Sequence, residues 1–278
     1  MQRLLIVGHG DIAGRVRVRL PAGAECRSIA RRLGADLDRP ETLSACAGWA
    51  DAVLHCAPPP PQGEGDPRTA NLLAAIERGA IIPARMVYLS TSGVYGDCSG
   101  ALVDETRPVN PQTARARRRV DAERRLQTWC AARGVALVVL RVPGIYAANR
   151  LPLERLRAGT PVLRAEDDVH TNHIHADDLA AICLRALEDS APAGVYNASD
   201  DSTLTMSEWF DLLAERAGLP RPPRVARAAA GAFISPEMLS YLSESRRLAN
   251  DKLKRELGVR LQYATVFEGV PRFAAAVA

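Results

Sequence analysis

The chain has 278 residues, 47% of them hydrophobic and 24% charged, and this composition excludes a disordered or fibrous protein. The net charge of +4 is the small difference between 36 basic and 32 acidic residues, so it does not indicate a nucleic-acid-binding protein. Lysine occurs only at Lys252 and Lys254, which leaves 34 of the 36 basic residues as arginines. Any mechanism that needs a lysine earlier in the chain is therefore excluded.

The cysteine pattern and the N-terminal segment indicate a cytoplasmic protein. The six cysteines show no CxxC spacing, and several lie in apolar stretches, so we expect reduced thiols. The apolar run from Leu4 to Val7 ends at Gly8, which is too early for a signal peptide or a membrane span. We expect no targeting segment and no membrane partner.

The first element is a short apolar strand, Arg3 to Val7, followed by a glycine-rich turn. The sequence Gly8-His9-Gly10-Asp11-Ile12-Ala13 fits G-x-G-x-x-[G/A], in which the glycines permit a tight turn and let a phosphate approach the backbone. The helix that follows would offer its free N–H groups to a pyrophosphate. We therefore predict dinucleotide binding by Gly8, Gly10, Asp11 and Ile12, against the alternative of a purely structural glycine turn.

Three further apolar strands, at 52–57, 86–90 and 136–142, alternate with helical stretches. This alternation predicts an α/β fold, a Rossmann-type doubly wound parallel sheet with helices on both faces. Ligands bind at the carboxyl ends of such strands. We therefore expect one crevice, lined by the glycine turn and by three sets of residues at strand ends: Cys56, Ala57 and Pro58; Ser90, Thr91 and Ser92; and Pro143, Gly144 and Ile145.

After residue 147 the regular alternation weakens. Helices are predicted at about 151–158, 178–188 and 248–261, and Thr205 and Glu208 form a T-x-x-E capping box that opens a further helix ending near Gly218. We expect one NAD(P)-binding Rossmann domain spanning residues 1–278. Its small C-terminal substrate lobe would be formed mainly by 147–175 and 199–261.

These motifs together resemble the short-chain dehydrogenase/reductase superfamily, in particular its extended, epimerase/dehydratase-like branch and the atypical members beside it. The resemblance is carried by the glycine turn, by Ser90-Thr91-Ser92-Gly93-Val94-Tyr95-Gly96, by Arg141-Val142-Pro143-Gly144-Ile145-Tyr146 and by Ile174-His175-Ala176-Asp177-Asp178-Leu179. It implies that Thr91, or its neighbour Ser90, supplies the hydroxyl that bonds the substrate's reacting oxygen. It also implies that Ser92, Tyr95, Tyr146 and His175 lie in or near the substrate pocket.

The sequence departs from the family pattern in two places. The segment between Ile29 and Asp36 is short, so we expect a helix of the first half, with or without a strand, to be missing or rebuilt there. The family's Tyr-x-x-x-Lys reads Arg115-x-x-x-Arg119, when aligned on Glu123. Arg119 could replace the lysine's charge, but Arg115 cannot shuttle a proton because a guanidinium keeps its proton at working pH.

A substitute proton donor could be Tyr95 or Tyr146. The alternative, which we favour for each, is that the ring packs structurally and its hydroxyl finds a single partner. Catalytic roles are therefore predicted only for Thr91, Arg119 and Arg115, and the loss of a positioned acid or base would lower the rate by about 10²–10⁴.

The residues after the second strand, read as Cys26 to Ala30, indicate the cofactor. Arg31 and Arg32 follow this strand, whereas no carboxylate appears before Asp36. An arginine at this place accommodates the 2′-phosphate of NADP, so NADP is favoured and NAD is the alternative. In an arginine-rich chain, these two side chains could also be merely exposed to solvent.

Two charged segments have competing readings. The histidines at 170, 173 and 175 with Asp177 could suggest a metal site, but their spacing fits a strand and a helix capped by Asp177 or Asp178, so we predict no metal. The arginines between 115 and 125 could suggest a nucleic-acid patch. The interleaved Asp121 and Glu123 favour a solvated helix face instead, or selection of an anionic substrate.

The sequence thus predicts an NAD(P)-binding oxidoreductase or epimerase/dehydratase-like protein that acts on a small polar or nucleotide-sugar-like molecule. The alternative is a catalytically inactive NADP(H)-binding protein with a regulatory or redox-sensing role, which the loss of Tyr-x-x-x-Lys favours. The sequence leaves both open, and it does not decide whether the protein is a homodimer.

Overall fold

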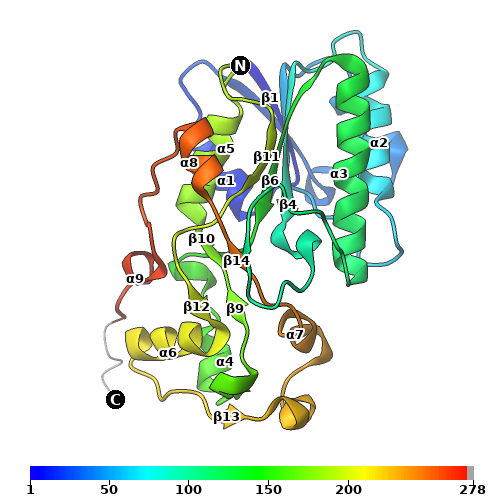
Figure 1. The fold of residues 1–278 in the computed structure, drawn as a ribbon. Helices are drawn as coiled ribbons and strands as arrows, with labels where there is room; N and C mark the ends of the chain where they lie inside the picture. The colour runs from blue at the N-terminus through cyan, green and yellow to red at the C-terminus, as the bar shows by residue number, and fades with distance from the viewer. Residues whose placement is uncertain (274–278) are drawn as a thin grey trace.

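The computed structural model describes residues 1–273, which form a parallel sheet with helices on both faces and a smaller group of elements below it (Figure 1). The six strands are hydrogen-bonded in the order β11-β6-β4-β3-β1-β2, and every pair is parallel. Their bounds are β1 Arg3–Val7, β2 Glu25–Ile29, β3 Ala52–His55, β4 Arg85–Thr91, β6 Ala136–Val142 and β11 Gly194–Asn197. The predicted α/β fold with a Rossmann-type sheet is confirmed.

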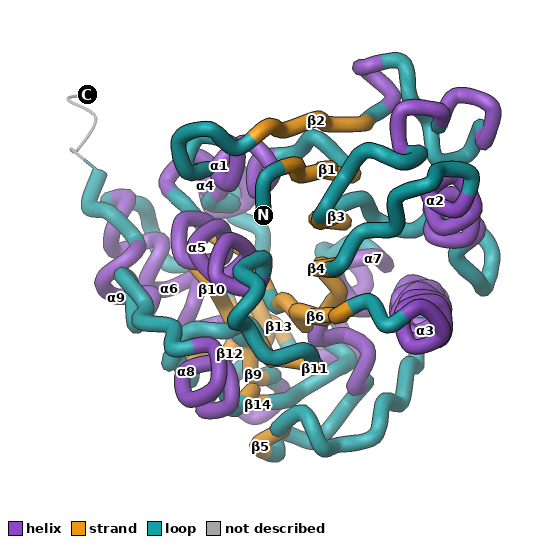
Figure 2. The backbone as a smooth tube through the Cα atoms, turned by 90° about the horizontal axis from the view of Figure 1, so that it is seen from above, coloured by secondary structure: helices purple, strands orange, loops and turns teal. Residues whose placement is uncertain are grey.

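Two helical layers cover the sheet, as the view from above shows (Figure 2). On one face lie α2 (Pro67–Glu77) and α3 (Ala114–Arg133), and on the other lie α1 (Asp11–Arg17) and α5 (Ala176–Ala186). Side chains alternate along β1, so that Leu4 and Ile6 enter the core beneath α1 and α5. Leu5 and Val7 enter the core beneath α2 and α3. All four are fully buried, as expected for a strand that is covered on both faces.

The sheet ends at β2, where the usual strand order 3-2-1-4-5-6 would place one more strand. Between β2 and β3 the chain forms only three short 3-10 turns: Arg31–Leu33, Pro40–Thr42 and Ser44–Cys46. The shortened segment therefore omits a helix, as its length predicts, and a strand with it. Leu37 and Leu43 from this segment pack into the core beside α2, which closes the gap.

The elements below the sheet come mostly from the second half of the chain (Figure 1). Tyr146, Leu156, Trp209 and Phe210 belong to a separate apolar cluster here. The elements are β5 Leu102–Val103, β7 Gly144–Tyr146, α4 Leu153–Arg157, β8 Val162–Leu163, β9 His170–Thr171, β10 His173–His175, β12 Leu204–Thr205, α6 Met206–Ala217, β13 Arg224–Val225, α7 Pro236–Tyr241, β14 Arg247–Leu248 and α9 Val266–Gly269, besides four 3-10 turns. The helix α8 (Asp251–Leu257) lies instead at the level of the sheet, beside β11 (Figure 1).

The ends of three helices can be compared with the predicted caps and bounds. The capping box of α6 is present, with the Thr205 side chain bonded to the Glu208 N–H and the Glu208 side chain bonded to the Thr205 N–H. The predicted cap of α5 is wrong, because the helix begins two residues early and His175 caps it by accepting the Asp177 N–H on Nδ1 at 3.2 Å. The helix predicted at 248–261 is shorter and spans Asp251–Leu257.

Within residues 1–273, all six cysteines are free thiols, and no helix is long and apolar enough to cross a membrane. No group of three or more histidine, cysteine or acidic side chains in that range is placed to hold a metal ion.

Candidate functional site

Two adjoining cavities lie at the carboxyl ends of the strands. The smaller, of about 370 Å³, runs from the glycine turn past the ends of β2, β3 and β4. The larger, of about 940 Å³, lies between α3, the end of β4 and the elements below the sheet. Arg119, Ile145 and Arg150 line both. The segments expected to form one crevice therefore do meet there.

The first two glycines of the turn, Gly8 and Gly10, differ in how much space the structure leaves for a side chain. Gly8 has φ +92°, and a Cβ there would lie 2.8 Å from the backbone nitrogen of Ala57, so only glycine fits. Gly10 precedes α1 with an ordinary φ of −91°, and a Cβ there would meet nothing within 4 Å. No side-chain hydrogen bond caps α1, and the residues at its start, Gly10 to Ala13, line the smaller cavity. The glycine turn therefore leaves a cradle at the helix end that an anion could enter.

The two arginines after β2 differ in whether they line a cavity. Arg31 lines both cavities, and no carboxylate of the described chain pairs with it. Arg32 donates from Nη2 to the His9 carbonyl oxygen at 2.6 Å and lines neither cavity. Asp36 lines the smaller cavity, and its Oδ1 accepts the Asp38 N–H at 3.0 Å. Of the predicted pair, only Arg31 is placed to contact a ligand.

The end of β3 contributes Cys56, Ala57 and Pro58 to the smaller cavity, as expected. Burial raises the pKa of the Cys56 thiol to about 12, so this sulfur is a neutral wall and not a nucleophile. Pro143 and Gly144 line the larger cavity, and Ile145 lines both.

Ser90 and Thr91, the two candidate hydroxyls at the end of β4, have different partners. Ser90 lines the smaller cavity, as expected, but its Oγ donates to the Glu123 carboxylate, which is itself paired with Arg141. The hydroxyl hydrogen of Ser90 is therefore already in use. Thr91 lines the larger cavity, where its Oγ1 accepts the Gly93 N–H at 3.2 Å. The hydroxyl hydrogen of Thr91 remains available to a ligand. Ser92 also lines the larger cavity, although only 5% of its surface is exposed.

Arg119 stands where the two cavities join. Its Nη1 donates to the Leu89 carbonyl oxygen at 2.8 Å and to the Tyr88 hydroxyl at 3.1 Å. These bonds fix the guanidinium against the end of β4, while no carboxylate within residues 1–273 neutralises it. The position therefore holds a fixed positive charge between the two cavities.

Arg115, one helical turn earlier, faces the larger cavity. Its guanidinium carbon lies 3.9 Å above the centre of the Tyr241 ring, which belongs to α7. Tyr241 is 43% exposed and lines the same cavity. Sequence reasoning missed Tyr241, because α7 is a short helix without a motif and only the folded chain brings it to α3.

Tyr95 is not a pocket residue, and this prediction is wrong. The ring is fully buried and its hydroxyl donates to Asn197 Oδ1 at 2.9 Å. The Arg141 guanidinium packs 4.7 Å from the ring centre, and burial raises the pKa of the Tyr95 phenol. The structural reading of this tyrosine, favoured from the sequence, is the one that the packing bears out.

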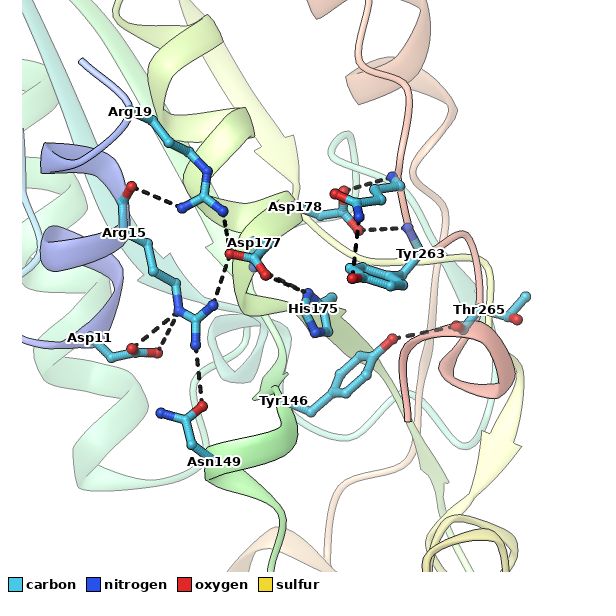
Figure 3. Close-up of polar contacts among 11 residues, drawn as sticks. Asp11, Arg15, Arg19, Tyr146, Asn149, His175, Asp177, Asp178, Tyr263 and Thr265 are labelled. Carbon is cyan, nitrogen blue, oxygen red and sulfur yellow. Dashed lines mark hydrogen bonds and ion pairs between the residues drawn. The ribbon is translucent and has the colours of Figure 1, made fainter. Parts of the chain in front are cut away.

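Tyr146 and His175, both expected in or near the substrate pocket, have different outcomes (Figure 3). Tyr146 lines the larger cavity with its ring, but its hydroxyl points to the Thr265 carbonyl oxygen at 3.4 Å, and burial raises the pKa of the phenol. His175 lines a separate surface pocket beside Asp177 and Tyr263, not the larger cavity. Assigning His175 to the substrate pocket is therefore wrong, and Tyr146 offers its ring there but not its hydroxyl.

The larger cavity is strongly positive. Eight arginines line it, against Glu244 as the one carboxylate among the lining residues. Three of these arginines have carboxylate partners, in the pairs Arg68–Asp38, Arg150–Asp11 and Arg246–Glu244. The remaining five have no carboxylate partner within residues 1–273, so the cavity favours an anionic ligand. They are Arg31, Arg115, Arg118, Arg119 and Arg155.

The comparisons with known proteins agree with this architecture. Residues 35–199 match the model of the NAD dependent epimerase/dehydratase family, and the chain belongs to that family. A solved structure of a functionally unknown conserved protein from Silicibacter pomeroyi DSS is 32% identical with a TM-score of 0.78, and the match covers 97% of this chain and 96% of that one. The resemblance to the extended short-chain dehydrogenase/reductase branch is thereby confirmed.

Two further relatives are more distant. Protein YeeZ of Escherichia coli K12 is 27% identical over 62% of this chain, and the match spans 61% of its own length. A human epimerase family protein, solved with NADPH, is 19% identical with a TM-score of 0.73, covering 96% of this chain and 97% of that one. At this identity, the second likeness shows the fold alone.

Proposed function

We propose that the protein binds NADP(H) along the carboxyl edge of the sheet, with NAD as the alternative, and carries out reductase-type chemistry on a small polar substrate in the larger cavity. The observation that carries this proposal is the cradle at Gly10. The space beside Gly10 is empty, the N-terminus of α1 is uncapped, and the strand ends line one continuous wall. A pyrophosphate fits such a site by charge and by size.

The residues of this chain suit the dinucleotide along its length. The α1 N–H groups and Gly10 would hold the pyrophosphate, and Ala57 and Ile145 would form walls of its cleft. Arg31 would pair with a 2′-phosphate, which supports NADP over NAD.

Bound NADPH would supply a hydride to an acceptor at the junction of the two cavities. Thr91 would donate its hydroxyl to the acceptor oxygen, and Arg119 would stabilise the negative charge that develops there, because its guanidinium is already fixed by Leu89 and Tyr88. Arg115 can stabilise charge but cannot provide the proton that the reduced oxygen needs, so that proton would come from solvent. We therefore expect turnover that is slow for this fold, by about 10²–10⁴.

One observation favours the second candidate, an NADP(H)-binding regulatory or redox-sensing protein without turnover. The position that would hold a proton-transferring tyrosine holds Arg115, and the hydroxyls of Tyr95 and Tyr146 point away from the larger cavity. Such a protein would keep the dinucleotide site and lose only the chemical step.

Turnover separates the two candidates. NADPH oxidation would be followed with a panel of aldehydes, ketones and nucleotide sugars, for the wild type and for Thr91→Ala. The reductase proposal predicts NADPH oxidation with at least one acceptor, and a loss of about tenfold or more in kcat for Thr91→Ala. NADPH binding without oxidation by any acceptor would support the regulatory candidate, whereas absence of dinucleotide binding would refute both.

A further inference from the structure

The side chain of Arg115 is held in place yet has none of its donors in use. The guanidinium of this α3 residue is stacked on the Tyr241 ring of α7 at 3.9 Å. Among residues 1–273, no carboxylate lies within ion-pair distance of it, and no side chain or carbonyl accepts a hydrogen bond from it. Both residues line the larger cavity, so the free edge of the guanidinium is accessible to a ligand there.

The arginines next to Arg115 on α3 all have partners, so the lack of a partner is specific to Arg115 and is not shared by the basic face of the helix. Arg117 is paired with the Glu64 carboxylate. Arg118 donates from Nη1 to the Gly63 carbonyl oxygen at 2.7 Å, and Arg119 donates to Leu89 and Tyr88. Arg115 is therefore the one member of this group of four that has no hydrogen-bond or ion-pair partner within residues 1–273.

We propose that Arg115, positioned by Tyr241, is the binding site for a carboxylate of the substrate. This inference rests on the proposed function, since it places the substrate in the larger cavity. A guanidinium offers two parallel N–H donors that match the two oxygens of a carboxylate. Stacking on the Tyr241 ring fixes the plane of the fork, so less side-chain entropy is lost when the carboxylate binds.

The other walls of the cavity indicate the rest of the substrate. Met206, Trp209 and Phe210 from α6 line it, together with Met238 from α7. Trp209 and Phe210 also belong to the apolar cluster below the sheet, which holds them in place. A ligand that satisfies both parts of this cavity is a carboxylic acid with an apolar or aromatic body.

Tyr241 acts in this account through its ring. Replacing it with phenylalanine keeps the stacking surface, whereas alanine removes it. A rival role for Tyr241, as a hydroxyl that bonds the ligand, predicts instead that phenylalanine is as harmful as alanine. The pair of variants therefore distinguishes a positioning residue from a direct ligand contact.

The test is calorimetric titration of the full chain with benzoate and with its neutral analogue benzamide. We expect Arg115→Gln to weaken benzoate binding by about 10- to 100-fold, the usual effect of losing hydrogen bonds to a charged group, and to leave benzamide binding unchanged. Arg117→Gln is the matched control, because Arg117 lies on the same helix and is paired with Glu64 outside the cavity. We expect it to bind benzoate as the wild type does.

The Tyr241 variants complete the series. Tyr241→Phe should retain benzoate affinity within about twofold, and Tyr241→Ala should lose several-fold of it. Equal benzoate affinities for Arg115→Gln and Arg117→Gln would overturn the inference, and so would a wild type that binds benzamide as tightly as benzoate or that binds no benzoate at all. Melting curves of each variant identify any that fail to fold.

NADPH titration of the same proteins keeps this inference separate from the proposed function. If the wild type binds NADPH but Arg115→Gln binds benzoate normally, only the carboxylate site is refuted. If no dinucleotide binds but benzoate binding depends on Arg115, the proposed function fails and the carboxylate site stands.

Discussion

Glu123 on α3 and Arg141 on β6 form an ion pair of 2.9 Å beneath the candidate site, with side chains only 4% and 7% exposed. The other carboxylate oxygen accepts the Ser90 hydroxyl. The pair therefore ties α3 to the ends of β4 and β6. Because α3 also carries Arg115 and Arg119, the geometry of the cavities depends on this contact.

Removing one partner of this pair should destabilise the protein strongly. Arg141→Met leaves the Glu123 carboxylate buried without its counter-charge, and the expected loss in free energy of unfolding is about 3–5 kcal/mol. Urea denaturation measures it. The double variant Glu123→Leu, Arg141→Met should recover much of the loss, since no charge is then left buried. A single variant as stable as the wild type would show that the pair does not hold α3 to the sheet.

Alanine at the two glycines of the first turn should have opposite effects. Gly8→Ala is strained by its positive φ and by the 2.8 Å approach to the Ala57 nitrogen. It should lower the free energy of unfolding by at least about 1–3 kcal/mol. Gly10→Ala meets nothing within 4 Å in the folded chain, so its melting temperature should not change. Its methyl group would occupy the space proposed for the pyrophosphate, and NADPH affinity should fall about tenfold.

Melting curves of the two variants measure the effect on stability, and NADPH titrations measure the effect on cofactor affinity. Unchanged NADPH affinity in a folded Gly10→Ala protein would place the pyrophosphate elsewhere.

Arg31 and Arg32 form a matched pair for cofactor choice. Arg31→Ala should weaken NADPH binding by about tenfold and NADH binding little, because only NADPH carries the 2′-phosphate. Arg32→Ala removes a bond to the His9 carbonyl and should affect both dinucleotides alike. Fluorescence titration with each dinucleotide gives the ratio of the NADPH affinity to the NADH affinity for each variant. Equal losses of NADPH and NADH affinity in Arg31→Ala would refute a 2′-phosphate contact at Arg31.

Asp200 makes stability depend on pH near neutrality. Burial raises the pKa of this carboxyl to about 7, and its Oδ2 has no hydrogen-bond partner within residues 1–273. In the unfolded chain, an aspartate has a pKa of about 3.9. Between these values the folded protein keeps a proton that the unfolded chain releases, so the free energy of unfolding falls as pH rises.

Asp200→Asn removes this dependence. The free energy of unfolding of the variant, relative to that of the wild type, should rise by on the order of 2 kcal/mol between about pH 5 and about pH 8. Urea denaturation of both proteins at the two pH values measures the gap. A gap that stays constant would mean that Asp200 has an ordinary pKa in the folded protein.

Features set by local sequence could be predicted well. The strand at 136–142 has the predicted bounds, and the glycine turn and the capping box at Thr205 form as expected. Each depends on apolar run length, glycine or short-range side-chain bonding, which a few neighbouring residues determine. The missing helix after β2 also followed from segment length, whereas the loss of a strand with it is shown by the strand order of the sheet.

Features set by long-range packing could not be predicted. Tyr95 turns inward because Asn197, 102 residues later, accepts its hydroxyl. His175 caps α5 and lines another pocket, where the Tyr263 ring, 88 residues later, packs against it with 4.0 Å between ring centres. Tyr241 reaches Arg115 only when α7 folds against α3. No periodicity or motif in the sequence encodes these three contacts.

The most direct test of the account is calorimetric titration of the wild-type chain with NADPH and with NADH. We expect saturable binding of one NADPH per chain, with a Kd that is below millimolar and lower than the Kd for NADH. If neither dinucleotide binds below millimolar concentration, the cleft beside Gly10 is not a cofactor site, and the proposed function is contradicted.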